Sequence, residues 1–228
     1  MIRGVILFIF VSLSEAFGGV QNLPALPNGV TAAAVQVDAS GNIYVAGAIT
    51  PSAPKSASDT SDAYVAKLSP DGSQVLWSAT LGGSSVDRAP ALALGSDGSV
   101  YLNGYTTSVD FPTTQGSMQP GLGYSVGQAF AAKLSPAGAA VYATFIGGTS
   151  YTLPGSIVVD ASGDAFITGT TGLAGFPTTP GSISGLAETA IQLSPAGSAN
   201  PQAVTIPLDA MGVRTREQNV LIWIQSEN

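Results

Sequence analysis

The chain of 228 residues contains no cysteine and no histidine. Without these two residue types there is no thiol nucleophile, no Ser-His-Asp triad, no imidazole or thiolate zinc site and no covalent haem attachment. The lack of cysteine also means that no disulfide stabilises the fold, although it does not identify the compartment. We expect no cofactor and no metal ion, and we assign no catalytic residue.

Charged residues are scarce. Asp, Glu, Lys and Arg make up 9% of the chain, against about 25% in ordinary soluble domains. The formal net charge is −7, and the basic residues form no cluster larger than Arg214 with Arg216. Because phosphate binding needs a Lys/Arg surface, we predict no nucleic-acid partner, and an anionic membrane surface is disfavoured for the same reason.

Turn residues and short apolar stretches are abundant instead. The chain has 28 glycines and 15 prolines, and 45% of its residues are hydrophobic, which is too apolar for a disordered linker. Its length is sufficient for one sizeable core or two small ones. This combination predicts an all-β protein with frequent chain reversals.

The N-terminal sequence "MIRGVILFIFVSLSEAF" has the layout of a secretory signal peptide. One basic residue, Arg3, precedes a short apolar run, and small residues stand three and one positions before Phe17. We predict a signal peptide at 1–16, a lead-in at 17–31, and a secreted or cell-surface protein with no membrane span after cleavage. The alternative is a β-strand, because "AFGG" at 16–19 resembles "TLGG" at 80–83.

Three short phrases recur in a fixed order along the chain. The first of them reads "DASGNIYVAG" at 38–47, "GSDGSVYLNG" at 95–104 and "DASGDAFITG" at 160–169. The second ends each time in "LSPDG" or "LSPAG", and the third, "LWSATLGGSS" at 76–85, returns as "VYATFIGGTS" at 141–150. The period is roughly 60 residues, in the range of propellers and solenoids.

Each repeat unit predicts four strands, which in the first unit span 32–37, 43–49, 63–68 and 75–81. Residues suited to tight turns, such as Gly41 and Pro70, separate the first strand from the second and the third from the fourth. The strands are apolar on both faces, as a sheet packed between two neighbours requires. We therefore predict a β-propeller-like array of four-stranded antiparallel blades; the alternative is a β-solenoid.

These phrases, together with "FPTT" at 111–114, resemble the bacterial SBBP-type β-propeller repeat family. The resemblance covers about residues 32–206 in three units. We assign three blades within 32–207, at about 32–83, 89–148 and 155–207, followed by a divergent tail at 208–228. The first unit lacks the FPTT loop and the third lacks the terminal Gly-Gly. Membership would imply an extracytoplasmic repeat protein of largely undefined biochemical activity.

Three blades do not close a ring, because propellers have about 4–8. We expect an incomplete or open array. Self-association could complete the ring, the C-terminal segment could cover one end, or the chain could be a shortened version of a longer protein.

In such a blade the repeated turns share one side, and the FPTT loops and between-blade segments share the other. The polar phrase at Asp38 favours a hydrogen-bonded turn over a calcium loop, since the acidic ligands of an EF-hand are missing. The varied loop side is our candidate ligand-binding face. Its candidate residues are Asp87, Arg88, Asp110, Phe111, Thr113, Tyr124, Phe176 and Thr178.

Each candidate also has a structural alternative. Phe111 and Phe176 could anchor their loops to the blade, and Asp87 with Arg88 could form a local ion pair. Trp77 could stack on a sugar, although packing between blades is the stronger expectation.

The function we predict is a non-enzymatic binding scaffold for an unidentified protein or glycan. The alternatives are a secreted hydrolase or lyase that uses two carboxylates from Asp87, Asp110 and Glu188, a purely structural module, and a fragment without independent activity.

Overall fold

The computed structural model describes residues 26–115, 117–121, 127–171 and 176, and the backbone of strands at 188–193 and 203–204. Within these residues the chain forms strands, turns and irregular segments but no helix, which confirms the all-β prediction. Accordingly, the described part contains no helix with the length and apolar character needed to cross a membrane. The predicted signal peptide at 1–16 and tail at 208–228 lie outside the described residues.

The described strands follow one another as three groups of four. They are β1 (Val30–Val37), β2 (Ile43–Ile49), β3 (Asp62–Leu68), β4 (Val75–Leu81), β5 (Asp87–Leu94), β6 (Val100–Thr106), β7 (Gln128–Leu134), β8 (Ala140–Ile146), β9 (Thr152–Val159), β10 (Ala165–Thr171), β11 (Glu188–Leu193) and β12 (Ala203–Val204). In the first group β2 and β4 have the predicted bounds, β3 begins one residue earlier and β1 two residues earlier.

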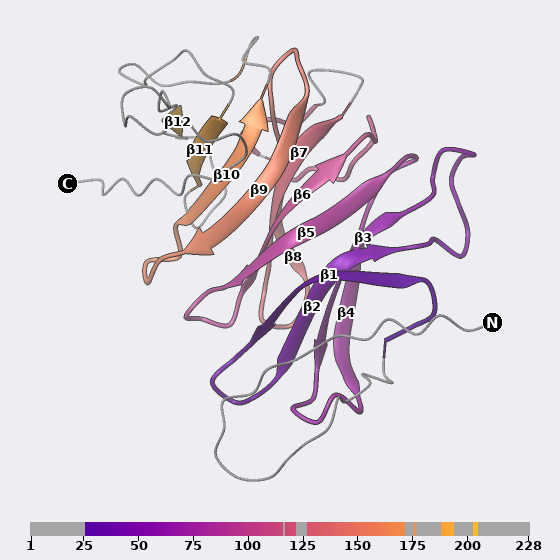
Figure 1. Cartoon of the computed structure of the whole chain (residues 1–228), viewed down its shortest axis with the longest axis vertical. Helices are drawn as coiled ribbons and strands as arrows, with labels where there is room; N and C mark the ends of the chain where they lie inside the picture. The colour runs from indigo at the N-terminus through magenta and orange to yellow at the C-terminus, as the bar shows by residue number, and fades with distance from the viewer. Residues whose placement is uncertain are drawn as a thin grey trace, which may run out of the picture.

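Each group is one antiparallel sheet in which every strand pairs with the next along the chain. The three sheets lie face to face, and β5 lies between β1 and β9 and contacts both (Figure 1). Within the described residues, the pairing between sheets is limited to one isolated parallel bridge between Ser61 and Val86. The described sheets form an open stack and do not close into a ring.

The core consists of apolar layers on both sides of the middle sheet. In β2, Tyr44 and Ala46 belong to the layer between the first and second sheets, whereas Ile43 and Val45 belong to a cluster on the opposite face. The layer between the second and third sheets includes Tyr101 of β6, at the register position that Tyr44 holds in β2. The prediction that the strands are apolar and buried on both faces is confirmed for the inner strands β2, β3, β6 and β7. It is wrong for β1, β4 and β9, where many residues are exposed or half-buried.

The last glycine of the repeated first phrase is required by a close backbone approach. A Cβ at Gly47 would lie 2.0 Å from the Thr31 carbonyl oxygen, and one at Gly104 would lie 2.4 Å from the Arg88 carbonyl oxygen. Both glycines face a register shift in the first strand of their sheet. A β-bulge brings the neighbouring backbone in at this point, so only glycine fits.

Candidate functional site

The stack has two unlike edges. We call the side with the tight turns the turn edge; in the first sheet it comprises residues 38–42 and 69–74. There the two turns lie together, since a Cβ on Gly41 would be 3.4 Å from the Cβ of Pro70. We call the opposite side the loop edge, and at the boundary between the first and second sheets it comprises residues 50–61, 82–86 and 107–111. The predicted separation of turns from loops is confirmed for these two sheets.

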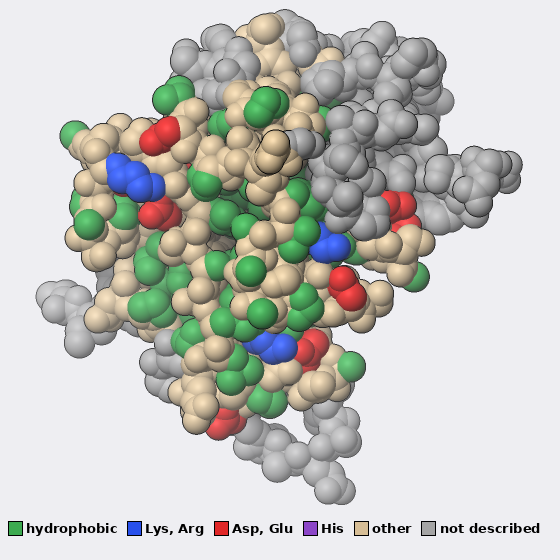
Figure 2. All heavy atoms as spheres, turned by 180° about the vertical axis from the view of Figure 1, so that it is seen from behind, with side chains coloured by type: hydrophobic (Ala, Val, Ile, Leu, Met, Phe, Trp, Pro, Cys, Tyr) green, Lys and Arg blue, Asp and Glu red, His purple; other side chains and the backbone are tan. Residues whose placement is uncertain are grey.

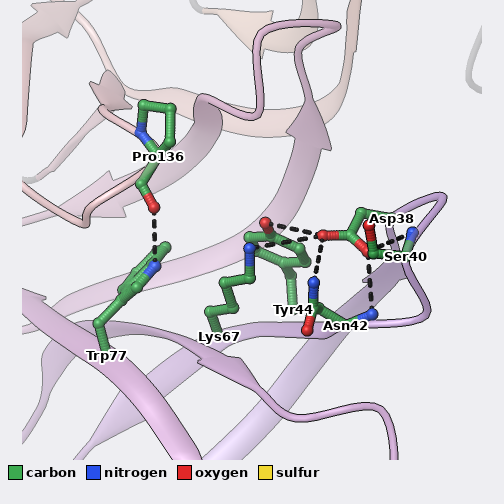
Figure 3. A network of polar contacts seen from close by, with 7 residues as sticks. All are labelled: Asp38, Ser40, Asn42, Tyr44, Lys67, Trp77 and Pro136. Atoms are coloured by element: carbon green, nitrogen blue, oxygen red, sulfur yellow. Dashed lines mark hydrogen bonds and ion pairs between the residues drawn. The ribbon is translucent and has the colours of Figure 1, made fainter.

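The polar half of the repeated phrase is a hydrogen-bonded turn, as predicted. One carboxylate oxygen of Asp38, Oδ1, accepts the backbone N–H groups of Ser40 and Asn42, each at 2.9 Å. The other, Oδ2, accepts the Asn42 amide at 2.9 Å and the Tyr44 hydroxyl at 3.2 Å (Figure 3). Burial opposes ionisation of Asp38, but the hydrogen bonds from Asn42 and Ser40 and the charge of Lys67 together lower its pKa.

The lysine of the repeated "AKLSP" phrase completes this turn. The ammonium group of Lys67 lies 3.5 Å from the Asp38 carboxylate and 4.9 Å from the centre of the Tyr44 ring. In the second sheet Lys133 lies 3.9 Å from Asp97 and 4.9 Å from the Tyr101 ring centre. The repetition of this lysine therefore has a structural reason, namely an ion pair and a cation–π contact at each turn.

Trp77 joins the first two sheets at the turn edge. Its indole N–H donates to the Pro136 carbonyl oxygen at 3.0 Å, and its ring packs edge-on against Tyr44 at 6.2 Å between centroids (Figure 3). A Cβ at Gly138 would lie 2.8 Å from this ring. Packing between sheets, the stronger of the two expectations for Trp77, is confirmed.

At the loop edge, the segment 82–86 that links the first sheet to the second is held by exposed polar groups. The Lys55 ammonium donates to the carbonyl oxygens of Gly82 and Gly83, at 2.7 and 3.1 Å. Asp110 Oδ1 accepts both the backbone N–H and the hydroxyl of Ser84, at 2.7 and 2.9 Å. These bonds fix an exposed lysine and an exposed carboxylate at consecutive residues of one half-buried segment.

Asp87 lies directly beneath that segment and is fully buried, with 0% of its surface exposed. Its Oδ2 accepts the Gly83 N–H at 2.9 Å and the Ser108 hydroxyl at 2.7 Å. Ser108 in turn accepts the Ser85 N–H at 2.9 Å. The structure thus brings Asp87 and Asp110 to adjacent residues of one segment, a proximity that their sequence spacing did not predict.

These two carboxyl groups have opposite electrostatic environments. Burial raises the pKa of Asp87, and nearby Asp62 raises it further, although hydrogen bonds from Thr106, Ser108 and Gly83 oppose the shift. The Ser84 N–H lowers the pKa of Asp110, helped by the Ser84 hydroxyl and the Lys55 charge. Asp110 is therefore the carboxylate that is ionised and available at the surface.

The remaining predicted site residues are distributed differently. Arg88 of β5 is exposed, and the Thr113 hydroxyl donates to the Pro120 carbonyl oxygen at 3.0 Å. Phe111 is buried against Phe130 and Phe145, with centroids 4.5 and 5.7 Å apart, and Phe176 is buried in the layer between the second and third sheets. This burial supports the anchoring alternative for both rings.

The side chains of three further predicted residues are not described by the structure. Tyr124 and Thr178 lie outside the described residues, and so does the side chain of Glu188.

Three charged residues at this edge, Lys55, Asp59 and Asp62, were not among the residues predicted from the sequence. Asp59 is 3% exposed, and its Oδ2 accepts the Lys55 backbone N–H at 2.6 Å. For Asp62 the repeat held a signal, because position 62 is an aspartate where the matching position of the second unit is Gln128. In the described part of the chain, no three acidic side chains are arranged to hold a metal ion.

Comparison with models of known protein families gives no match, and comparison with curated proteins gives none either.

Proposed function

We propose that the chain is a secreted or cell-surface repeat protein of the SBBP-like β-propeller type. On this proposal its sheets are blades, and it acts as a non-enzymatic scaffold that binds a protein or glycan through the loop edge. The support for the blade assignment is the succession of three four-stranded antiparallel sheets packed face to face.

The observation that carries the binding role is the polar surface around segment 82–86. Lys55 and Asp110 are exposed there, Ser84 is half-buried, and all three are held in place by short hydrogen bonds. A fixed cation beside a fixed carboxylate offers both a donor and an acceptor to a sugar hydroxyl or a peptide group. Charged side chains are sparse on the face shown in Figure 2, where acidic and basic groups lie beside each other, so recognition through paired polar groups suits this surface better than recognition of a highly charged partner.

A screen of glycans and surface proteins against the purified chain tests this proposal. We expect binding of at least one ligand to fall about tenfold or more in Lys55→Gln and in Asp110→Asn, since hydrogen bonds to charged groups contribute about 1.5–3 kcal/mol. Asp71→Asn, at the turn edge, is the control and retains full affinity. The proposal fails if no ligand binds, or if the turn-edge variant loses binding while the loop-edge variants keep it.

Enzymatic hydrolysis or elimination is the second candidate, because two carboxyl groups with opposite pKa shifts resemble an acid–base pair. Against it, Asp87 is fully buried and does not reach the surface where a substrate would bind. Turnover that Asp87→Asn abolishes without loss of folding would favour the enzyme over the binding scaffold.

Self-association to complete a ring is a further part of the proposal. The described sheets form an open stack, and an uncovered sheet face favours association. Light scattering on the folded chain should give a mass that is a multiple of one chain; the mass of a monomer would refute assembly into a ring.

A further inference from the structure

Among the residues that the structure describes, four buried oxygen atoms that accept no hydrogen bond lie where β3 and β5 begin. They are Asp59 Oδ1, Ser61 Oγ, Asp62 Oδ1 and Asp87 Oδ1. Backbone contacts place these residues together, since the Asp87 N–H donates to the Ser61 carbonyl oxygen at 2.7 Å. We call these four residues the acidic junction. A buried carboxylate oxygen that accepts no hydrogen bond is costly, so this arrangement calls for a compensating positive charge or proton.

The nearby cations do not compensate the acidic junction directly. The Lys55 ammonium donates to the Gly82 and Gly83 carbonyl oxygens, and Arg88 is exposed. The ion pairs found among the described residues lie elsewhere, at Lys67 and Lys133. Asp110 is a further charged group near this region, and its carboxylate accepts the Ser84 N–H at 2.7 Å.

The fold itself does not require these acids. At the boundary between the second and third sheets, the register positions of Asp62 and Asp87 are occupied by Gln128 and Thr152. Gln128 donates to the Gly148 carbonyl oxygen and accepts from the Gln119 amide, and Thr152 donates to the Thr171 hydroxyl at 3.2 Å. The same fold therefore forms this junction with neutral side chains between the second and third sheets. Packing alone does not explain why the junction between the first two sheets is acidic.

We propose that the acidic junction is a proton-dependent contact between the first two sheets, intact while it holds a proton and weakened when the proton is lost. The proton goes to solvent, and no bond other than O–H is made or broken. Loss of the proton from Asp62 or Asp87 adds a negative charge beside the other acidic groups of the junction. The segment 82–86 is the part affected, because Gly83 and Ser108 both bond to Asp87.

The electrostatics support this direction. Burial raises the pKa of Asp62, and the charge of Asp59 raises it further while Lys55 opposes the shift. Asp87 shifts in the same direction, chiefly through burial. A folded-state pKa above the unfolded value gives stability that is fully present below the unfolded pKa and is lost as pH rises through the folded pKa. The junction should therefore loosen as pH rises from about 4 towards neutrality.

Native-state hydrogen exchange of the unmodified chain between pH 4 and 7 is the first test. After correction for intrinsic exchange, the protection factor of the Gly83 N–H, which is bonded to Asp87, should fall about tenfold for each unit of pKa elevation. The Gly147 N–H, bonded to the neutral Gln119 side chain at 3.1 Å, is the matched control and should keep a constant protection factor. Equal behaviour of the two amides overturns the proposal.

Asp87→Asn is the second test, because its amide oxygen can still accept both hydrogen bonds. As pH rises from 4 to 7, the unmodified chain should lose stability and the variant should not. The ratio of the variant's unfolding equilibrium constant to that of the unmodified chain should therefore fall at least tenfold. Should Asp87→Asn fail to fold, Asp62→Asn replaces it. Asp110→Asn is the control, and because the pKa of Asp110 is lowered, its unfolding constant relative to the unmodified chain should stay nearly constant over this range. A calcium-dependent rise in melting temperature that Asp87→Asn removes would show a metal ion in place of the proton and overturn the proposal.

Discussion

The clearest consequence of the loop-edge packing concerns Phe111. Its ring is 4% exposed and lies against Phe130 and Phe145. Truncating a buried phenylalanine to alanine costs about 3–5 kcal/mol, from lost burial and the cavity that remains. Because the ring contacts two aromatic neighbours within the main core, we expect Phe111→Ala to destabilise the chain by about 3–4 kcal/mol.

Guanidinium denaturation followed by tryptophan fluorescence measures this change. The matched control is Val109→Ala in the same loop, where the side chain is 70% exposed and the expected change is within about 0.5 kcal/mol. If Phe111→Ala unfolds at the same denaturant midpoint as Val109→Ala, the ring does not anchor the loop, and its role as a ligand contact regains support.

Three further predictions follow from single contacts. Gly104→Ala should destabilise by several kcal/mol, because the added Cβ would lie 2.2 Å from the Phe130 ring and 2.4 Å from the Arg88 carbonyl oxygen; a melting temperature equal to that of the unmodified chain would contradict the bulge packing. Trp77→Phe should lower the free energy of unfolding by about 1 kcal/mol or less, since it removes one exposed hydrogen bond to Pro136; a larger loss would mean that the ring packs more tightly than its contacts indicate. The hydroxyl of Ser69 and the N–H and hydroxyl of Ser73 hold the pKa of Asp71 at about 2. That depressed value gives stability above pH 3.8 that is lost as pH falls towards 2, so Asp71→Asn should flatten the acid limb of an unfolding curve, and an unchanged acid limb would refute this role.

Local features of this fold were predictable from the repeated phrases alone. The bounds of β2 and β4, the turn at Asp38 and the packing role of Trp77 follow from apolar patterning and turn residues, whose effects act over a few positions. Because the chain holds three copies of the repeat, their alignment also separates the recurring strands and turns from the loops that differ.

The loop edge was harder to predict because its contacts join residues that lie far apart in the chain. Asp87 and Asp110 were both candidates, yet their approach depends on where the segment 82–86 passes between them. The burial of Asp87 could not be predicted from the sequence either, since an aspartate next to an arginine is usually exposed. Lys55 and Asp59 contribute only through the path of the loop before β3.

The proposed binding surface and the acidic junction both require segment 82–86 to lie against the loop that begins after β6. Because the chain has no cysteine, a pair of introduced cysteines tests this contact without interference. The Ser84 hydroxyl lies 2.9 Å from Asp110 Oδ1, so the double variant Ser84→Cys, Asp110→Cys should form an intramolecular disulfide rapidly in the folded state and slowly in denaturant. Ser84→Cys with Asp71→Cys, which joins opposite edges, should not cross-link in the folded state. Equal cross-linking of the two pairs, or none in the first, would contradict the assembly of the loop edge.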